Sequence, residues 1–150
     1  MSTKFLLAAF FCTFTGIITT QALGMGEPGI YYQNVTGEQD KCMLVSATTK
    51  GATTNTSLSS GDMEINSYAN LGLKPGDSVS IYIALNDGSC SVAGQTLILG
   101  TYQLTINKDG SGTNQQISCP AGDCKRIIFS TFSSSNFPYY TFEPANGLTH

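Results

Sequence analysis

Apolar and polar side chains alternate along residues 78–85 with the two-residue period of a β-strand. Every second position is aliphatic: Val79, Ile81, Ile83 and Leu85. The positions between them are Ser78, Ser80, Tyr82 and Ala84. Successive side chains of a strand point to opposite faces of its sheet. This pattern therefore predicts a strand with one face in a core and the other face directed outward.

Weaker alternation divides the rest of the chain into short segments separated by Gly, Pro, Asn and Asp. We expect strands over residues 30–35, 42–47, 63–66, 78–85, 92–99, 102–107, 114–119, 126–132 and 139–142. No window has the i, i+3, i+4 spacing of an amphipathic helix. The chain is thus predicted to be all-β, a two-layer antiparallel β-sandwich of immunoglobulin-like or jelly-roll-like type. A small antiparallel β-barrel is the alternative.

Hydroxyl side chains supply much of the polarity that charged residues supply in other domains. The 150 residues include 16 Ser and 18 Thr, while only 11% of the chain is charged. Residues 48–61 are the most hydroxyl-rich stretch, and we expect them to form a long surface loop. With 7 basic residues and a net charge of −3, the chain lacks the positive field that nucleic acids attract. Nucleic acid is therefore not an expected partner.

The N-terminal segment has the pattern of a secretory signal peptide. A short basic stretch is followed by an apolar run over residues 5–18, and the small residues Ala22 and Gly24 precede a predicted cleavage site. We expect a signal peptide over residues 1–24 and a single β-sandwich domain over residues 25–150, secreted or periplasmic. No later stretch is long and apolar enough to span a membrane.

Four cysteines remain after the predicted cleavage: Cys42, Cys90, Cys119 and Cys124. An even number in an exported chain predicts two disulfides, and three pairings are open. Pro-Ala-Gly-Asp between Cys119 and Cys124 is a turn sequence that brings its flanking residues together. We therefore favour Cys119–Cys124 and Cys42–Cys90 over the other two pairings.

Few residues have the chemistry of a catalyst. The mature chain has one histidine, His150, at its last position. A histidine-based triad or a copper site would need histidines held in fixed geometry. Asp62 and Glu64 lie two residues apart, and a small carboxylate-based hydrolase is the enzymatic alternative. We interpret the chain as a non-enzyme without a cofactor.

Residues 107–118 resemble a calcium-binding loop in part. Asn107, Asp109 and Ser111 stand at the first, third and fifth positions, where oxygen ligands are needed. The twelfth position is Ser118, where such loops have a bidentate glutamate. A hairpin turn explains the same residues without a metal, so we expect no metal site and keep calcium as the alternative.

Two segments carry tyrosines on both faces of a predicted strand. These are Tyr31 and Tyr32 near the mature N-terminus, and Tyr139 and Tyr140 near the C-terminus. One ring of each pair is expected in the core, and the other is a candidate surface for a ligand. Asn34 and Asn55 each begin an N-glycosylation pattern, which applies only in a eukaryotic host.

These features favour a small exported, non-enzymatic β-sandwich protein that binds a macromolecular partner or a glycan through loops and surface tyrosines. Abundant loops and hydroxyl groups, together with scarce catalytic groups, are the basis of this hypothesis. A structural subunit of a surface assembly is the second hypothesis, and it requires an unpaired edge strand.

Overall fold

A computed structural model describes residues 26–92, 94–120, 124–132 and 135–144. Nine strands lie within these ranges: β1 (Gly29–Asn34), β2 (Cys42–Thr48), β3 (Thr53–Leu58), β4 (Met63–Ser67), β5 (Ser78–Asp87), β6 (Gln95–Ile106), β7 (Gly112–Ser118), β8 (Ile127–Thr131) and β9 (Pro138–Phe142). A helix α1 (Tyr68–Leu71) and a 3-10 turn η1 (Cys124–Arg126) complete the elements. The predicted signal peptide and His150 lie outside the described residues.

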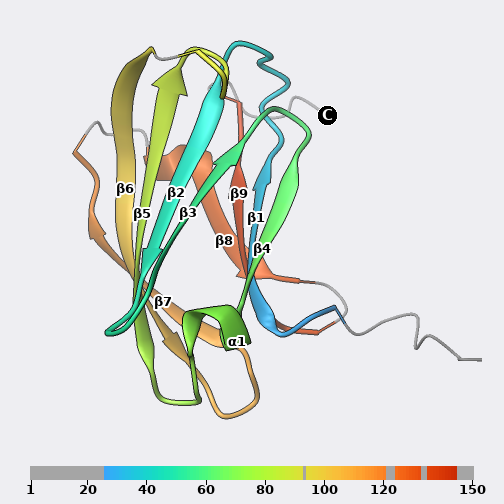
Figure 1. Ribbon diagram of the computed structural model, residues 1–150, viewed down its shortest axis with the longest axis vertical. Coiled ribbons are helices and arrows are strands. Elements are labelled where there is room, and N and C mark those ends of the chain that lie inside the picture. Colours follow the sequence, from blue (N-terminus) through green and yellow to red (C-terminus); the bar gives the residue numbers. More distant parts are fainter. Residues whose placement is uncertain (1–25, 93, 121–123, 133–134, 145–150) are drawn as a thin grey trace, which may run out of the picture.

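The strands form two sheets that pack face to face (Figure 1). The five-stranded sheet has the order β3-β2-β5-β6-β7, and the four-stranded sheet has the order β4-β1-β9-β8. All pairings are antiparallel except that of β1 with β9, which is parallel. The predicted sandwich is confirmed, and the sheets do not close into a barrel within the described part of the chain.

Two expected strands are one continuous strand in the structure. The segments 92–99 and 102–107 merge into β6, which has a bulge opposite Ile83 and Ala84 of β5. Gly100 lies at this bulge, and a Cβ atom there would lie within 3.0 Å of the Tyr102 ring. Glycine was expected to separate two strands, but here it makes room for a core side chain.

The expected long loop over residues 48–61 is largely a strand. Residues Thr53–Leu58 form β3, which pairs with β2 at the edge of the five-stranded sheet. Leu58 is the one fully buried side chain of β3. Because an edge strand can leave most of its side chains in water, its composition gave no apolar pattern to recognise, although threonine itself favours strands.

Aromatic rings join the two layers of the core. Tyr140 of β9 is fully buried, and its ring centroid lies 5.9 Å from that of Tyr32, 5.1 Å from that of Phe129 and 5.6 Å from that of Tyr102. Tyr102 belongs to the five-stranded sheet, and the other rings belong to the four-stranded sheet. The Tyr140 hydroxyl donates a hydrogen bond to Asn114 Oδ1 at 2.6 Å. Tyr140 is thus held by contacts from both sheets.

Both expected disulfides are present. Cys42–Cys90 joins the start of β2 to the loop between β5 and β6, with Cα atoms 4.9 Å apart. Cys119–Cys124 closes the connection from β7 to η1, with Cα atoms 5.5 Å apart. The two bridges fit a protein that folds outside the cytosol, because oxidising compartments preserve disulfides.

The two disulfides are predicted to differ in their effect on stability. Cys42–Cys90 spans 48 residues and Cys119–Cys124 spans 5. The longer loop removes more entropy from the unfolded chain, so Cys42→Ala with Cys90→Ala should lower the free energy of unfolding by about 2 kcal/mol more than Cys119→Ala with Cys124→Ala. Urea denaturation of the two double variants measures this difference. An equal loss in both variants would contradict the entropic explanation.

The core tyrosines predict a loss of stability in alkali. Burial raises the pKa of Tyr32, Tyr102 and Tyr140 above the ordinary value of about 10. The unfolded chain therefore releases these protons at a lower pH than the folded chain. Their contribution is intact below about pH 10 and is lost as the pH rises above it. The Tm should fall steeply above about pH 10, and less steeply in Tyr140→Phe; equal slopes would contradict this account.

Candidate functional site

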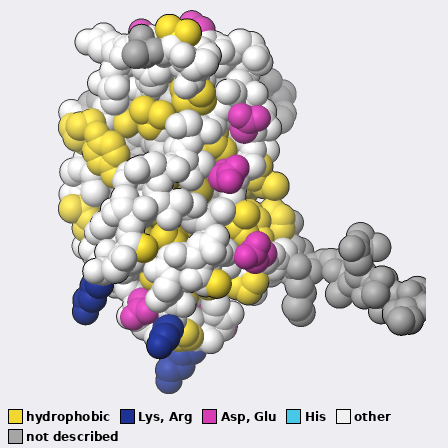
Figure 2. All heavy atoms as spheres, in the orientation of Figure 1, with side chains coloured by type: hydrophobic (Ala, Val, Ile, Leu, Met, Phe, Trp, Pro, Cys, Tyr) yellow, Lys and Arg dark blue, Asp and Glu magenta, His cyan; other side chains and the backbone are white. Residues whose placement is uncertain are grey.

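Hydroxyl and amide side chains cover most of the outer face of the five-stranded sheet, on which Leu44 is a partly exposed apolar residue. We call this surface the hydroxyl face, and it consists of Ser46, Thr48, Thr53, Asn55, Ser57, Ser78, Ser80, Tyr82, Thr101, Gln103, Thr105, Thr113 and Gln115. None of these residues is charged. In Figure 2 basic side chains gather at the lower end beside an acidic group, other acidic groups lie toward the right and at the top, and the middle of the view is mostly uncharged. The alternation of the strands creates this face, because the side chains between these positions fill the core.

The strand register arranges the hydroxyl face in rows. One row runs from β3 to β7 through Thr53, Thr48, Ser80, Gln103 and Gln115. Neighbouring hydroxyl groups in such rows contact one another, as Thr48 Oγ1 and Thr53 Oγ1 do at 3.2 Å. The rows offer a ligand many hydrogen-bond donors and acceptors at fixed spacing.

Tyr82 is the aromatic residue of the hydroxyl face. Its side chain is 37% exposed, in contrast to the buried tyrosines of the core. Ser46 and Thr101 are its direct neighbours across the sheet. Both are small, so no large side chain stands beside the ring within its own row. Tyr82 therefore presents an apolar ring with a polar tip among hydroxyl groups.

An open cleft of about 770 Å³ adjoins the hydroxyl face near the start of β5. The hydroxyl face contributes Thr48, Ser78, Ser80 and Gln103 to its lining. The walls are the turn between β2 and β3, over residues 49–52, and the residues 69–73, 76 and 77, which include the end of α1. Two of the lining side chains, Lys50 and Asp77, are charged. The cleft is thus mainly polar and continuous with the surface that carries Tyr82.

Local capping fixes the cleft wall. The Ser67 hydroxyl accepts a hydrogen bond from the Asn70 N–H at 3.1 Å and caps the start of α1. Gly72 ends the helix with a φ of 63°, a left-handed conformation that glycine adopts without strain. Thr49 Oγ1 donates to the Leu71 carbonyl oxygen at 3.3 Å and so ties the β2–β3 turn to the helix. The two walls of the cleft are therefore bonded to each other.

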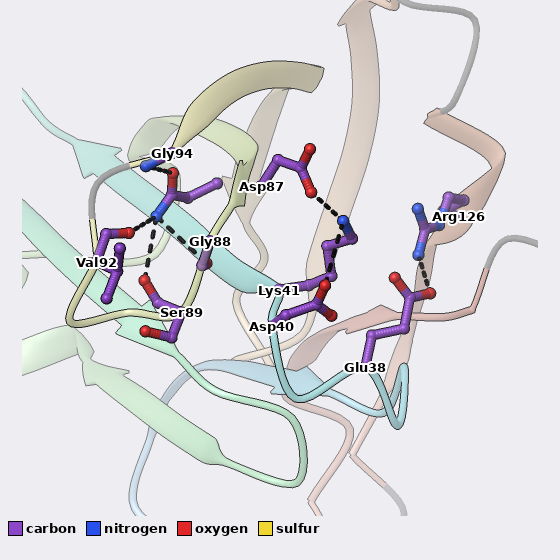
Figure 3. A network of polar contacts seen from close by, with 10 residues as sticks. Glu38, Asp40, Lys41, Asp87, Gly88, Ser89, Val92, Gly94 and Arg126 are labelled. Atoms are coloured by element: carbon purple, nitrogen blue, oxygen red, sulfur yellow. Dashed lines mark hydrogen bonds and ion pairs between the residues drawn. The ribbon is translucent and has the colours of Figure 1, made fainter.

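The opposite end of β5 is held by a network of polar contacts (Figure 3). Asn86 Nδ2 lies 3.3 Å from the Gly88 carbonyl oxygen, 3.2 Å from that of Ser89 and 2.9 Å from that of Val92. Asn86 Oδ1 accepts from the Gly94 N–H at 2.8 Å. This side chain organises the loop between β5 and β6, so its polar atoms serve the fold.

Ion pairs fix the neighbouring loop at that end (Figure 3). Lys41 pairs with Asp87, and Arg126 Nη2 lies 3.1 Å from Glu38 Oε1. The Arg126 guanidinium also lies 4.5 Å from the centre of the Phe142 ring. The loops at this end are pinned by side-chain contacts and by the Cys42–Cys90 bridge. These side chains therefore hold the loops of this end in place.

The tyrosines singled out from the sequence lie elsewhere. Tyr32 and Tyr140 are fully buried, and Tyr31 is 5% exposed, so these three rings do not form a surface. Tyr31 stacks on Phe132 with centroids 4.6 Å apart, and Tyr139 packs edge-on against both rings. Tyr139 is half-buried on the outer face of the four-stranded sheet. The exposed Tyr82 was missed, although the alternation of residues 78–85 already placed it opposite the aliphatic side.

The three residues of the alternative calcium site form hydrogen bonds with one another within the β6–β7 turn. Asp109 Oδ1 accepts from the Ser111 N–H at 3.0 Å and from the Ser111 hydroxyl at 2.6 Å. Asn107 Nδ2 donates to Ser111 Oγ at 2.9 Å. Within the described ranges, no three His, Cys, Asp or Glu side chains are grouped as a metal site. These oxygens already have partners in the hairpin turn.

The two candidate catalytic carboxylates and the two sequons have different surroundings. Asp62 Oδ2 accepts from the Ser59 N–H at 2.9 Å, and Glu64 is exposed on β4, away from the cleft lining. Asn34 is fully buried and bonds to Leu58 and Thr36, whereas Asn55 is exposed on the hydroxyl face. Only Asn55 has room for an attached glycan in the folded chain.

Comparisons with known proteins found no matching family model, no matching curated protein and no matching solved structure. In the part of the chain that the structure describes, no helix has the length and apolar character needed to cross a membrane.

Proposed function

We propose that this protein is a non-enzymatic glycan-binding protein whose binding site is the hydroxyl face with Tyr82 and the adjoining cleft. The observation that carries the proposal is Tyr82, a 37% exposed ring in an uncharged face of hydroxyl and amide groups. A sugar has an apolar ring face and a rim of hydroxyl groups. A tyrosine ring packs on the apolar face of the sugar, and serine, threonine and glutamine side chains form hydrogen bonds with its hydroxyl groups.

The surroundings of the cleft favour binding over hydrolysis. Glycoside hydrolysis uses two carboxyl groups that flank the scissile bond at about 5 to 9.5 Å from each other. Among the described residues, Asp77 is the one carboxylate in the cleft lining. Its Oδ2 atom accepts a hydrogen bond from the Lys74 N–H at 2.8 Å. The cleft therefore has the groups to hold a sugar and lacks a second acid to cleave it.

A structural role in a surface assembly is the second candidate. β3 forms an edge of the five-stranded sheet, and its six residues include no charged residue, Pro or Gly. Charges, prolines and bulges are the features that protect edges from pairing with another chain. Self-association through β3 would appear as a concentration-dependent rise in mass by analytical ultracentrifugation. A monomer at all concentrations would exclude this role for the isolated protein.

Replacing Tyr82 is predicted to weaken binding without unfolding the protein. Tyr82→Ala should lower the affinity for a bound oligosaccharide by about 1 to 3 kcal/mol, because the stacking surface is lost. The Tm should stay nearly unchanged, since the ring lies on the solvent side of the sheet. A glycan array probed with the purified protein identifies the oligosaccharide, and isothermal titration calorimetry measures its affinity.

Two further variants control this experiment. Tyr82→Phe keeps the ring and should retain most of the affinity. Tyr139→Ala removes a half-buried tyrosine from the other sheet and should leave the affinity unchanged. Equal affinities of wild type and Tyr82→Ala would contradict the proposed site, and loss of affinity in Tyr139→Ala alone would move the site to the four-stranded sheet.

We also propose export, with cleavage of the signal peptide before Met25. The two disulfides support an oxidising compartment. N-terminal sequencing of the protein from a secreting host should return a sequence that begins at or near Met25. A sequence that begins at Met1 would contradict the cleavage.

A further inference from the structure

The described basic side chains divide into an ion-paired group and an unpaired group, and Lys125 of η1 belongs to the unpaired group together with three lysines of the cleft end. At the pinned end, Lys41 and Arg126 are ion-paired. Lys50, Lys74 and Lys108 form no ion pair with any residue that the structure describes. These three lysines therefore keep their charge available to solvent or to a ligand.

The three lysines lie on three connections at the cleft end, which is the end with α1 in Figure 1 and the lower end of Figure 2. Lys50 is in the β2–β3 turn, Lys74 lies between α1 and β5, and Lys108 is in the β6–β7 turn. Backbone hydrogen bonds hold two of these connections together, with the Gly76 N–H 2.7 Å from the Ile106 carbonyl oxygen. The Thr49–Leu71 bond attaches the third. The three lysines therefore lie on connections that are bonded to one another at one end of the sandwich.

Two carboxylates of this end accept hydrogen bonds within the turns that contain them. Asp77 accepts from the Lys74 N–H, and Asp109 accepts from Ser111. The bonds from Ser111 lower the pKa of Asp109, so it stays ionised but faces its own turn. Glu27 is a third carboxylate of this end, because it precedes Pro28, whose carbonyl oxygen accepts from the Tyr68 N–H of α1. The three lysines and three carboxylates balance at this end, whereas the chain as a whole has a net charge of −3.

Lys50 is the one of these three lysines that lies in the proposed binding site. It is exposed and contributes to the lining of the cleft. Across the cleft floor, Ser80 and Thr48 belong to the row of the hydroxyl face next to that of Tyr82. A chain of sugar units that stacks on Tyr82 and extends toward the start of β5 therefore meets an ammonium group in the cleft.

We propose that the ligand is an anionic glycan, with a sugar ring on Tyr82 and a carboxylate or sulfate group beside Lys50. This inference rests on the proposed glycan-binding function and adds the class of glycan. Because the lysines are exposed, their attraction for an anion is modest in size and is screened by salt. The recognition should accordingly depend on ionic strength, unlike stacking on the tyrosine.

The test compares three oligosaccharides of equal length: an oligogalacturonate, its carboxyl-reduced neutral counterpart, and a sulfated oligosaccharide. Wild type should bind at least one of the acidic probes about fivefold or more tighter than the neutral probe at low salt, and this advantage should shrink as salt is raised. Comparison of the carboxylated and sulfated probes shows which acid is preferred.

Lysine variants locate the acidic subsite. Lys50→Gln should remove most of the preference for the acidic probe. Combining it with Lys74→Gln and Lys108→Gln should abolish the preference. Lys125→Gln, an exposed lysine of η1 near the pinned end, is the matched control and should have no effect. The Tm of each variant confirms that it is folded.

The outcomes separate this inference from the function on which it rests. If Lys50→Gln and the triple variant bind the acidic and neutral probes as wild type does, the acidic subsite is wrong and glycan binding stands. If wild type binds the neutral probe as tightly as the acidic probes, the acidic subsite is again wrong and glycan binding stands. If no probe binds and the array is also blank, both the inference and the proposed function are overturned.

Discussion

The position of β5 at the centre of the five-stranded sheet is the constraint on which the rest of the structure depends. Ile81 pairs with Ala47 on one side and Tyr102 on the other, and all three are buried. The next residue, Tyr82, pairs with Ser46 and Thr101 on the opposite face. A shift of one residue would place the tyrosine in the core and the isoleucine in water. Burial of the aliphatic side of β5 therefore fixes where the candidate binding face lies.

The two ends of the sandwich differ in how they are built. At one end, the Cys42–Cys90 bridge, the Asn86 contacts and the ion pairs of Lys41 and Arg126 hold the loops. At the other end, turn and helix caps shape a cleft, and Lys50, Lys74 and Lys108 form no ion pair with a described residue. Fixing the strands at one end allows the other end to carry polar groups that contribute little to stability. This division agrees with a rigid scaffold that presents a site at its open end.

The sequence predicted the layers and the disulfides well because both follow from local patterns. Alternation located nearly all the strands, and the Pro-Ala-Gly-Asp turn indicated the shorter bridge. The strand β3 was missed because an edge strand has hydrogen bonds on one side only and does not need apolar side chains. Which of the paired tyrosines is exposed could not be predicted from the sequence, for a different reason. Whether a ring is exposed depends on what covers it, and Phe132 and Tyr102 do so from distant parts of the chain.

The most direct test of the account is to map the ligand-binding surface residue by residue. Backbone amide resonances of the isotope-labelled protein are followed by NMR while the oligosaccharide that binds best is added. The account predicts that the largest shifts occur at Tyr82 and its row neighbours Ser46 and Thr101, with further shifts at Lys50 in the cleft. Shifts centred on Tyr31 and Tyr139 instead, with the five-stranded sheet unchanged, would contradict it.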